Sequence, residues 1–271
     1  MQPPHQDDTV ILMRTFLCIS LLTALLIPTT AQATGEQRIY YYGDSIGAES
    51  FGYFDQTMSR KTTWNSVDRT IPGSSPCDWY SRLSADMKIG VPRVIVIEAF
   101  GNNISSCQLR SGRRAPSDTQ AYWQQYQSDL DNLVSRAPSN LPIWLSPAAA
   151  ARNDLLSGSS HEAKMLQVMQ VVAASHSNLH VIRAGLAVDG PGGTYAYSAS
   201  CLSLEPCSNQ PGIGQNILHA HDGLHFCPAI YNATIDLLRH CPVYASGAYR
   251  FGNAQAQAVI SGLGLQSAAR H

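Results

Sequence analysis

The sequence predicts an α/β protein: a three-layer α/β/α sandwich with a mainly parallel five-stranded sheet. Two observations lead to this class. Short apolar runs alternate along the chain with longer segments of helical periodicity, which is the pattern of consecutive βαβ units. In addition, the run RVIVIEAFG at 93–101 is apolar almost throughout, as expected for a strand that is buried on both faces.

Five segments are expected to form the strands of this sheet. In chain order they are RIYYYG at 38–43, SVDRTIPG at 66–73, RVIVIEAFG at 93–101, LPIWLSP at 141–147 and NLHVIRA at 178–184. The carboxyl ends of parallel strands meet at one edge of a sheet, and functional groups gather there. Polar or glycine residues that directly follow these strands are therefore candidates for a site.

Helices are expected between the strands and after the last one. Residues 117–136 show the clearest spacing, because their apolar residues recur on one face, and Ser117 is the expected N-cap. Further helices are expected at 46–59, 160–176, 228–240 and 253–264. The stretch 185–220 is rich in Gly, Pro and Ser and is expected to form a long loop that walls or covers the site.

The N-terminal stretch predicts export. Residues 14–33 combine a basic start at Arg14, a short apolar core and the small-residue sequence Ala31-Gln32-Ala33, which are the three parts of a secretory signal peptide. The apolar core is too short to cross a bilayer comfortably. We therefore expect residues 1–33 to be removed, with Met13 as an alternative start of translation, and the competing interpretation is a signal-anchor that stays attached.

Residues 34–271 are then expected to form a single secreted, periplasmic or extracellular domain. The net charge of the chain is −1 and charged residues are sparse, so nothing in the composition favours a nucleic-acid or anionic membrane partner. Apart from Cys18 in the signal, six cysteines remain, an even number that predicts three disulfides in an exported chain.

Two stretches carry the residue types of nucleophilic catalysis. Ser45 lies in GDSIG at 43–47, directly after the first expected strand. A serine hydroxyl needs a base to remove its proton, usually a histidine that a carboxylate orients. Asp222 precedes His225 by three residues in HAHDGLHFC, which lets the carboxylate reach the imidazole. The GxSxG pattern also occurs in α/β-hydrolases, but their nucleophile follows a central strand rather than the first one.

These residues resemble the SGNH (GDSL-type) hydrolases, because four short blocks occur in the order that this family has. GDSI holds Ser45 as the nucleophile, and DGLH holds Asp222 and His225. The resemblance implies that Gly73, in TIPGSS, and Asn103, in FGNN, complete an oxyanion hole with the Ser45 N–H. The chain departs from the family at Ile104, where an aspartate is usual, and at Ile46, where leucine is common.

The resemblance implies a secreted serine esterase that hydrolyses short acyl or carbohydrate O-acyl esters without a cofactor. Its expected partner is a small-molecule or glycan ester. Two further functions stay open. One is an acyltransferase that passes the acyl group to a glycan from the same site. The second is a non-catalytic module that binds carbohydrate or lipid on this fold.

The positions of the blocks also suggest the cysteine pairing. Cys77 and Cys107 each follow a residue assigned to the oxyanion hole by four positions, and their loops leave neighbouring strands, so we expect them to pair. The remaining expected pairs are Cys201–Cys207, in the lid, and Cys227–Cys241, around the helix that follows the catalytic histidine.

Metal binding and glycosylation are not expected. Three histidines, His219, His221 and His225, lie close together, but the glycine and proline around them disfavour the helix that a zinc-binding pair needs, so no metal is expected. Asn103 and Asn232 head glycosylation sequons. An oxyanion-hole residue cannot carry a sugar, and Asn232 falls in an expected helix, so neither is expected to be modified.

Overall fold

The computed structural model describes residues 37–112, 115–152, 159–203, 205, 214–227 and 245–265, with the side chains of 159–160 excepted. The expected signal peptide, the expected helix at 228–240 and part of the expected lid lie outside these residues. Within the described part of the chain, no helix is both long and apolar enough to span a membrane.

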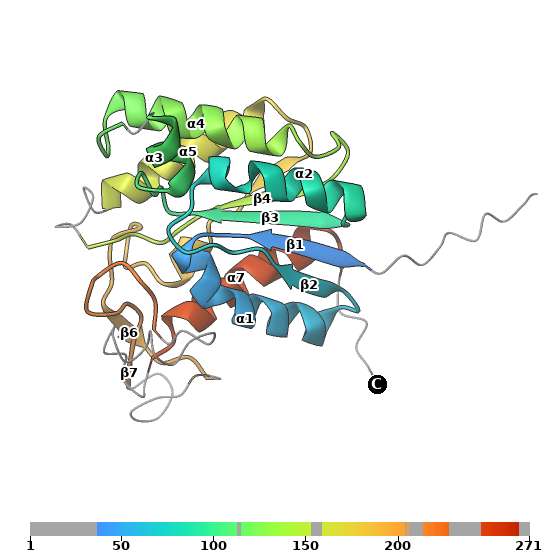
Figure 1. Ribbon diagram of the computed structural model, residues 1–271. Coiled ribbons are helices and arrows are strands. Elements are labelled where there is room, and N and C mark those ends of the chain that lie inside the picture. The colour runs from blue at the N-terminus through green and yellow to red at the C-terminus, as the bar shows by residue number, and fades with distance from the viewer. Residues whose placement is uncertain are drawn as a thin grey trace, which may run out of the picture. The chain divides into compact units, whose positions relative to one another are not determined.

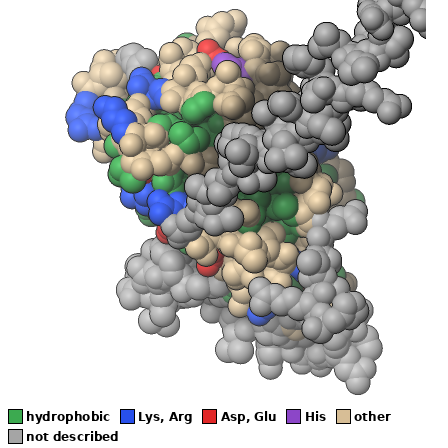
Figure 2. Space-filling view, turned by 90° about the vertical axis from the view of Figure 1, so that its right-hand side faces the viewer, with side chains coloured by type: hydrophobic (Ala, Val, Ile, Leu, Met, Phe, Trp, Pro, Cys, Tyr) green, Lys and Arg blue, Asp and Glu red, His purple; other side chains and the backbone are tan. Residues whose placement is uncertain are grey.

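The sheet has the five strands that the sequence predicts, all parallel, in the order β2-β1-β3-β4-β5. The strands are β1 (Arg38–Tyr42), β2 (Asn65–Asp68), β3 (Val94–Ala99), β4 (Ile143–Pro147) and β5 (Leu179–Val181). Their carboxyl ends share one edge, at the left of Figure 1. Figure 2 looks at the opposite end, where Lys and Arg side chains lie among hydrophobic and uncharged ones.

Helices cover both faces of the sheet, which confirms the three-layer sandwich (Figure 1). One layer holds α1 (Ser45–Lys61) and α7 (Gly247–Gly262), and the other holds α2 (Tyr80–Ile89), α4 (Gln120–Val134) and α5 (Ser159–Ala174). Alternation along β1 divides the core: Tyr41 packs with the first layer, whereas Tyr40 and Tyr42 pack with the second. All three tyrosines are buried.

Three details of the helices differ from the sequence-based expectation. The helix α4 begins at Gln120, and its N-cap is Thr119 rather than Ser117, because the Thr119 side chain accepts a hydrogen bond from the Tyr122 N–H. The helix α2 has no counterpart among the expected helices, since it buries only Leu83 and Asp86 and so lacks an apolar stripe. The last helix begins six residues earlier than expected, at Gly247 instead of residue 253.

Short elements join these layers. They are the 3₁₀ helices η1 (Pro76–Trp79) and η2 (Ala184–Ala187), the helix α3 (Ser106–Ser111), and a two-stranded antiparallel sheet of β6 (Ser198–Ser200) and β7 (Gln215–Ile217). This small sheet lies in the stretch for which the sequence predicts a loop. A buried ion pair attaches the stretch to α7, because the Arg250 Nε and Nη2 donate to the two carboxylate oxygens of Glu205 at 2.6 and 2.7 Å.

Candidate active site

Ser45 is the first residue of α1, directly after β1. Its neighbour Asp44 is the N-cap of that helix, and Asp44 Oδ1 accepts the Ile46 N–H at 2.9 Å. The strand-to-helix turn is tight: a Cβ on Gly47 would lie 2.7 Å from Glu98 Oε2. The Ser45 N–H belongs to the first turn, where helix geometry provides no partner, so it points out of the helix and is available to a ligand.

Three predicted residues come together at this turn. His225 Nε2 lies 3.0 Å from Ser45 Oγ, although the two residues are 180 positions apart in the chain. His225 Nδ1 lies 2.7 Å from Asp222 Oδ2. The second carboxylate oxygen, Asp222 Oδ1, accepts the backbone N–H groups of Leu224 and His225, each at 3.0 Å. The three side chains therefore form a continuous line from carboxylate to imidazole to hydroxyl.

The contact with Asp222 fixes which nitrogen of the His225 ring carries a proton, namely Nδ1. Burial alone would raise the pKa of Asp222, but hydrogen bonds from the His225 side chain and from backbone N–H groups lower it to about 2. Asp222 is thus an ionised acceptor at neutral pH. Its partner, Nδ1, then carries the proton, and Nε2 is left as an acceptor that faces the Ser45 hydroxyl.

Backbone anchors hold the loop that carries His225. The Phe226 N–H donates to the buried Glu49 Oε2 at 2.8 Å, and Glu49 belongs to α1, the same helix that begins with Ser45. On the opposite side, the Arg152 N–H donates to the Gly223 carbonyl at 2.9 Å, and Arg152 Nη1 donates to the His221 carbonyl at 3.1 Å. Sequence reasoning missed Glu49 and Arg152, since neither belongs to a motif.

Two buried acids lie beneath the nucleophile. The Asp44 N–H donates to Glu98 Oε2 at 3.3 Å, and neither side chain is exposed. Burial raises the pKa of Asp44, although the N–H groups of Phe100 and Ile46 oppose this rise. Burial and the Asp44 charge raise the pKa of Glu98 well above its ordinary value. The surroundings of Glu98 therefore favour its neutral form.

The two residues predicted to donate to the oxyanion, Gly73 and Asn103, differ in whether their N–H groups already have acceptors. Gly73 lies in an exposed turn with φ +76°, a conformation that favours glycine, and its N–H donates to no backbone oxygen of the described residues. The Asn103 amide points elsewhere, because its Nδ2 donates to the Ala115 carbonyl at 3.3 Å and to Ser117 Oγ at 2.7 Å. The structure does not bring the Asn103 side chain into the network of Asp44 and Ser45.

The amide that joins this network belongs to Asn102. Its Nδ2 donates to Asp44 Oδ2 at 3.0 Å and to the Ser74 carbonyl at 3.1 Å. Asn102 thus connects the residue before the nucleophile to the residue after Gly73. The sequence FGNN offers two adjacent asparagines, and only the backbone path decides which amide reaches Asp44. The signal is therefore present in the sequence but ambiguous.

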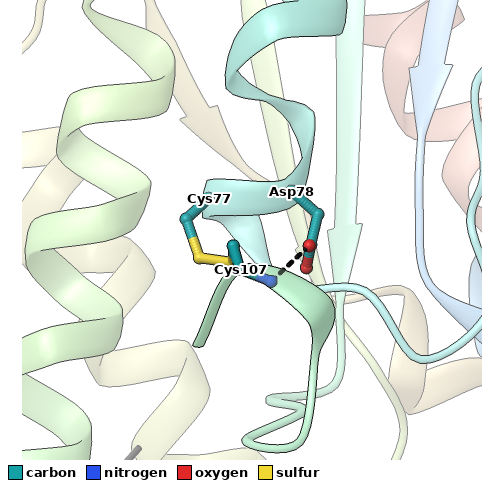
Figure 3. A group of neighbouring side chains, drawn as sticks. All are labelled: Cys77, Asp78 and Cys107. Carbon is teal, nitrogen blue, oxygen red and sulfur yellow. Dashed lines mark hydrogen bonds between the residues drawn. A yellow bond between two sulfur atoms is a disulfide. The ribbon is translucent and has the colours of Figure 1, made fainter. Parts of the chain in front are cut away.

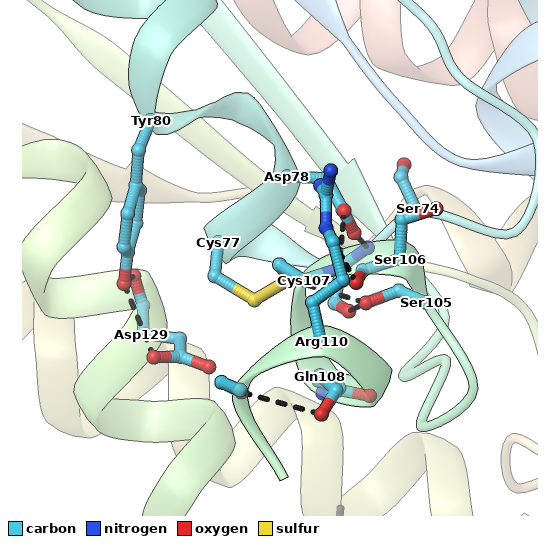
Figure 4. Close-up of a disulfide and its surroundings, with 12 residues drawn as sticks. Ser74, Cys77, Asp78, Tyr80, Ser105, Ser106, Cys107, Gln108, Arg110 and Asp129 are labelled. Carbon is cyan, nitrogen blue, oxygen red and sulfur yellow. Dashed lines mark hydrogen bonds between the residues drawn. A yellow bond between two sulfur atoms is a disulfide. The ribbon is translucent and has the colours of Figure 1, made fainter. Parts of the chain in front are cut away.

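A disulfide joins the two loops that carry Gly73 and Asn102. Cys77 pairs with Cys107, as predicted, with their Cα atoms 6.0 Å apart (Figure 3). Beside it, Asp78 Oδ1 accepts the Cys107 N–H at 2.8 Å and Asp78 Oδ2 accepts the Ser75 N–H at 3.0 Å. Figure 4 shows the disulfide and its neighbours at the junction of η1 and α3.

The remaining predicted pairs are only partly described. Cys201 and Cys227 are each disulfide-bonded. Their predicted partners, Cys207 and Cys241, lie outside the described residues, so the pairing Cys201–Cys207 and Cys227–Cys241 stays a prediction.

The histidines do not converge as metal ligands would. His219 is buried, its Nδ1 lies 2.8 Å from the Ala196 carbonyl, and burial lowers its pKa to about 4. Among the described residues, the side chains with metal-like spacing are Cys77, Asp78 and Cys107. The two sulfurs of that group are joined to each other, and a disulfide offers no thiolate to an ion.

Comparison with family models and with curated proteins gives no match for this chain. Solved structures do match it. A lipase/acylhydrolase from Enterococcus faecalis superposes with a TM-score of 0.51 at 19% identity, over 84% of this chain and 96% of that one. A predicted acylhydrolase from Bacteroides fragilis gives 0.52 at 14% identity, over 85% and 89%. The chain therefore has the SGNH (GDSL-type) hydrolase fold that its motifs predict.

Proposed function

We propose that this protein is an exported serine esterase, with Ser45 as nucleophile, His225 as general base and Asp222 as the group that orients the base. The observation that carries the proposal is the line of two hydrogen bonds from Asp222 through His225 to Ser45 Oγ, at 2.7 and 3.0 Å. This geometry lets Nε2 accept the hydroxyl proton as the oxygen attacks. The structurally similar acylhydrolases support the same class of reaction.

The reaction follows from the positions of the groups. Ser45 Oγ attacks the ester carbonyl while His225 takes its proton, and His225 then gives that proton to the leaving alcohol. The resulting acyl-enzyme is resolved by water, which His225 deprotonates in turn. Donors for the negatively charged oxygen are the N–H groups of Ser45 and Gly73 and an asparagine amide. We assign the amide to Asn102, which contacts Asp44, in place of the Asn103 that the family resemblance implies; in this role one Asn102 N–H exchanges the Ser74 carbonyl for the oxyanion.

The proposed substrates are short acyl esters or O-acyl groups on carbohydrate, and the proposed location is outside the cytoplasm. The signal sequence and the disulfides support the location, since disulfides persist in oxidising compartments. No cofactor enters the proposed chemistry. A glycan acyltransferase would use the same residues, and it differs only in whether water or a sugar hydroxyl resolves the acyl-enzyme.

A fluorophosphonate probe, which labels activated serines, tests the proposal directly. The wild-type protein should be labelled and should hydrolyse acetyl esters, whereas Ser45→Ala should lose both properties and keep its circular dichroism spectrum. A Ser45→Ala protein that keeps more than a few per cent of the activity would refute the assignment. A wild-type protein that is folded but never labelled would favour a binding module.

A substrate panel separates hydrolysis from acyl transfer. Acetyl, butyryl and long-chain esters and acetylated glycans should be compared at matched concentrations, with and without an unacylated glycan as acceptor. Free acid as the product indicates hydrolysis. Acylated acceptor at the expense of free acid indicates transfer.

A further inference from the structure

We propose that a buried histidine–aspartate pair, His161 and Asp118, positions the loop that carries the oxyanion-hole amide. This proposal rests on the proposed function and adds a positioning residue to it. His161 Nδ1 lies 2.7 Å from Asp118 Oδ1, and His161 Nε2 lies 2.8 Å from the Phe100 carbonyl. The histidine side chain is 1% exposed, so these contacts form away from competing water.

The chemistry of the two acceptors sets the protons on His161. A backbone carbonyl only accepts hydrogen bonds, so Nε2 must carry a proton. Nδ1 faces a carboxylate, which also accepts. Both ring nitrogens are therefore engaged by groups of the protein itself. Neither nitrogen faces the substrate side, so His161 does not serve as a second general base.

The contacts of His161 lead to Ser45 in a short path. The same Phe100 residue whose carbonyl accepts from His161 donates its N–H to Asp44 Oδ2 at 2.8 Å. The Asn102 amide donates to that same Asp44 oxygen. His161 therefore holds one side of the Phe100 backbone while Asp44 holds the opposite side. The Asn102 side chain is placed by the backbone that these two groups fix.

Gly101, the next residue of the loop, is held by a contact from the same helix layer. The Tyr122 hydroxyl donates to the Gly101 carbonyl. Gly101 has φ +116°, and a Cβ there would lie 2.6 Å from both His161 Nε2 and the Tyr122 hydroxyl. Only glycine fits this approach. Two successive carbonyls are thus drawn toward the α4–α5 layer, and the Asn102 amide that follows them contacts Asp44 and the Ser74 carbonyl.

Asp118 itself has an unusual backbone. Among the described residues, it is the only one besides glycine with a positive φ, at +60°. A residue in the left-handed region costs free energy that surrounding contacts must offset. Asp118 precedes the N-cap of α4, and its strained conformation brings its carboxylate to His161 at the start of α5. This conformation is more than a helix cap requires, because Thr119 already supplies the cap.

The molecule also contains a control pair of the same chemistry. His176 Nε2 lies 2.7 Å from Asp131 Oδ1, so this pair also links α4 to the α5 region, just past the end of α5. The Asp131 side chain is 51% exposed. Both residues lie at the far ends of their helices from Asp118 and His161, and hence away from the Phe100–Asn102 loop. If a histidine–aspartate bridge between these helices served only stability, mutation of either pair would leave kcat of the folded protein unchanged.

Four variants test the proposal with a small acetyl ester as substrate: His161→Leu, His161→Gln, Asp118→Asn and His176→Leu. We expect His161→Leu to lower kcat by about ten- to a hundredfold, with KM changed by less than about threefold. The reason is that a misplaced Asn102 amide stabilises the transition state less, while binding of the substrate itself is unaffected. His161→Gln keeps an N–H for the Phe100 carbonyl and should recover most of kcat. Asp118→Asn should fall between them, and His176→Leu should match the wild type.

A double-mutant cycle with Asn102→Ala tests whether His161 affects kcat through the Asn102 amide. If His161 acts through Asn102, then His161→Leu should lower kcat by less than about threefold once the amide is gone. Equal losses in both backgrounds, or no recovery by His161→Gln, would overturn the proposal. Should His161→Leu fail to fold, Asp118→Asn takes its place in the cycle. Fluorophosphonate labelling of wild type and Ser45→Ala separates this failure from failure of the esterase assignment itself.

Discussion

Two of the histidine–aspartate pairs in the described part of the chain, His225–Asp222 and His161–Asp118, have the same 2.7 Å distance between ring nitrogen and carboxylate oxygen but differ in what the second ring nitrogen contacts. In His225–Asp222 that nitrogen faces the Ser45 hydroxyl, which can give up a proton. In His161–Asp118 it faces a carbonyl oxygen, which cannot. The aspartate contact alone therefore does not define a base. The third group decides whether the imidazole exchanges protons or only holds a backbone in place.

The two pairs also differ in the solvent exposure of their histidine side chains. The His225 and Asp222 side chains are 18% and 42% exposed, as a site that admits substrate and water requires. The His161 side chain is 1% exposed and stacks against the Phe100 ring, with centroids 4.7 Å apart. A reactive pair must remain accessible, whereas a positioning pair becomes stronger when water is excluded.

The largest difference between the pairs is expected in activity. His225→Ala should lower kcat by about ten-thousandfold or more, because no other group accepts the Ser45 proton, and Asp222→Ala should cost less. His161→Leu should stay at or below about a hundredfold. Steady-state kinetics on one acetyl ester measures all three variants. A His161 variant as inactive as His225→Ala would make the two pairs functionally equivalent and break the comparison.

The next largest effect should distinguish the adjacent asparagines. Asn102→Ala removes the amide that contacts Asp44 and should lower kcat by roughly a hundred- to a thousandfold, the usual effect of losing one oxyanion donor. Asn103→Ala removes contacts with Ala115 and Ser117 only and should lower kcat far less. KM should change little in both. The reverse order of effects would restore Asn103 to the role that the family resemblance implies.

The two pairs also show how far sequence reasoning reaches. Asp222 and His225 are three residues apart, so one turn of chain brings them together and the motif can be recognised locally. Asp118 and His161 are 43 positions apart and lie at the starts of different helices. No local pattern joins them, and their meeting depends on how α4 and α5 pack. The proposed catalytic pair is therefore predictable from sequence, and the proposed positioning pair is not.

Elements of the fold can likewise be divided into those set by a local sequence pattern and those set by packing. The strand β3 is predictable because it is apolar almost throughout and is buried at every position, whereas β2 has a single apolar residue, Val67, and is recognised mainly by its place in the βαβ alternation. The helix α2 is not predictable, because packing of η1 and Leu83 determines it rather than its own periodicity. Likewise, Thr119 and Ser117 are equally good caps in the sequence, and the contact of Ser117 with Asn103 leaves Thr119 to cap the helix.

A smaller effect is expected from the disulfide, which holds the same loop as His161 through a different contact. Cys77→Ser/Cys107→Ser opens a bridge that spans 30 positions, and chain entropy predicts a loss of about 3 to 4 kcal/mol in unfolding free energy. At temperatures where the double variant remains folded, kcat should fall by a few-fold, since donor placement loosens. Denaturant titration and kinetics measure the two quantities separately. Full activity with reduced stability would leave only the structural role.

The smallest effect concerns the contribution of Asp222 to stability, in contrast with the large contribution to activity that we propose for it. The folded protein lowers the pKa of Asp222 from its ordinary 3.8 to about 2. A depressed carboxyl pKa stabilises the fold above the unfolded-state value, and this contribution is lost as pH falls from about 4 toward about 2, because the unfolded chain takes up the proton first. The side chain is 42% exposed, so solvent screens much of the interaction.

Asp222→Asn lacks this titration. The stability gap between wild type and Asp222→Asn should therefore be small and constant above about pH 5, and it should narrow as pH is lowered through about 4. Urea unfolding of both proteins at several pH values measures the gap, and kcat at neutral pH, from the same preparations, shows that the variant is nonetheless strongly impaired. A gap that widens in acid would mean that Asp222 is not the ionised partner of His225. The proposed line from Asp222 through His225 to Ser45 would then lose its electrostatic basis.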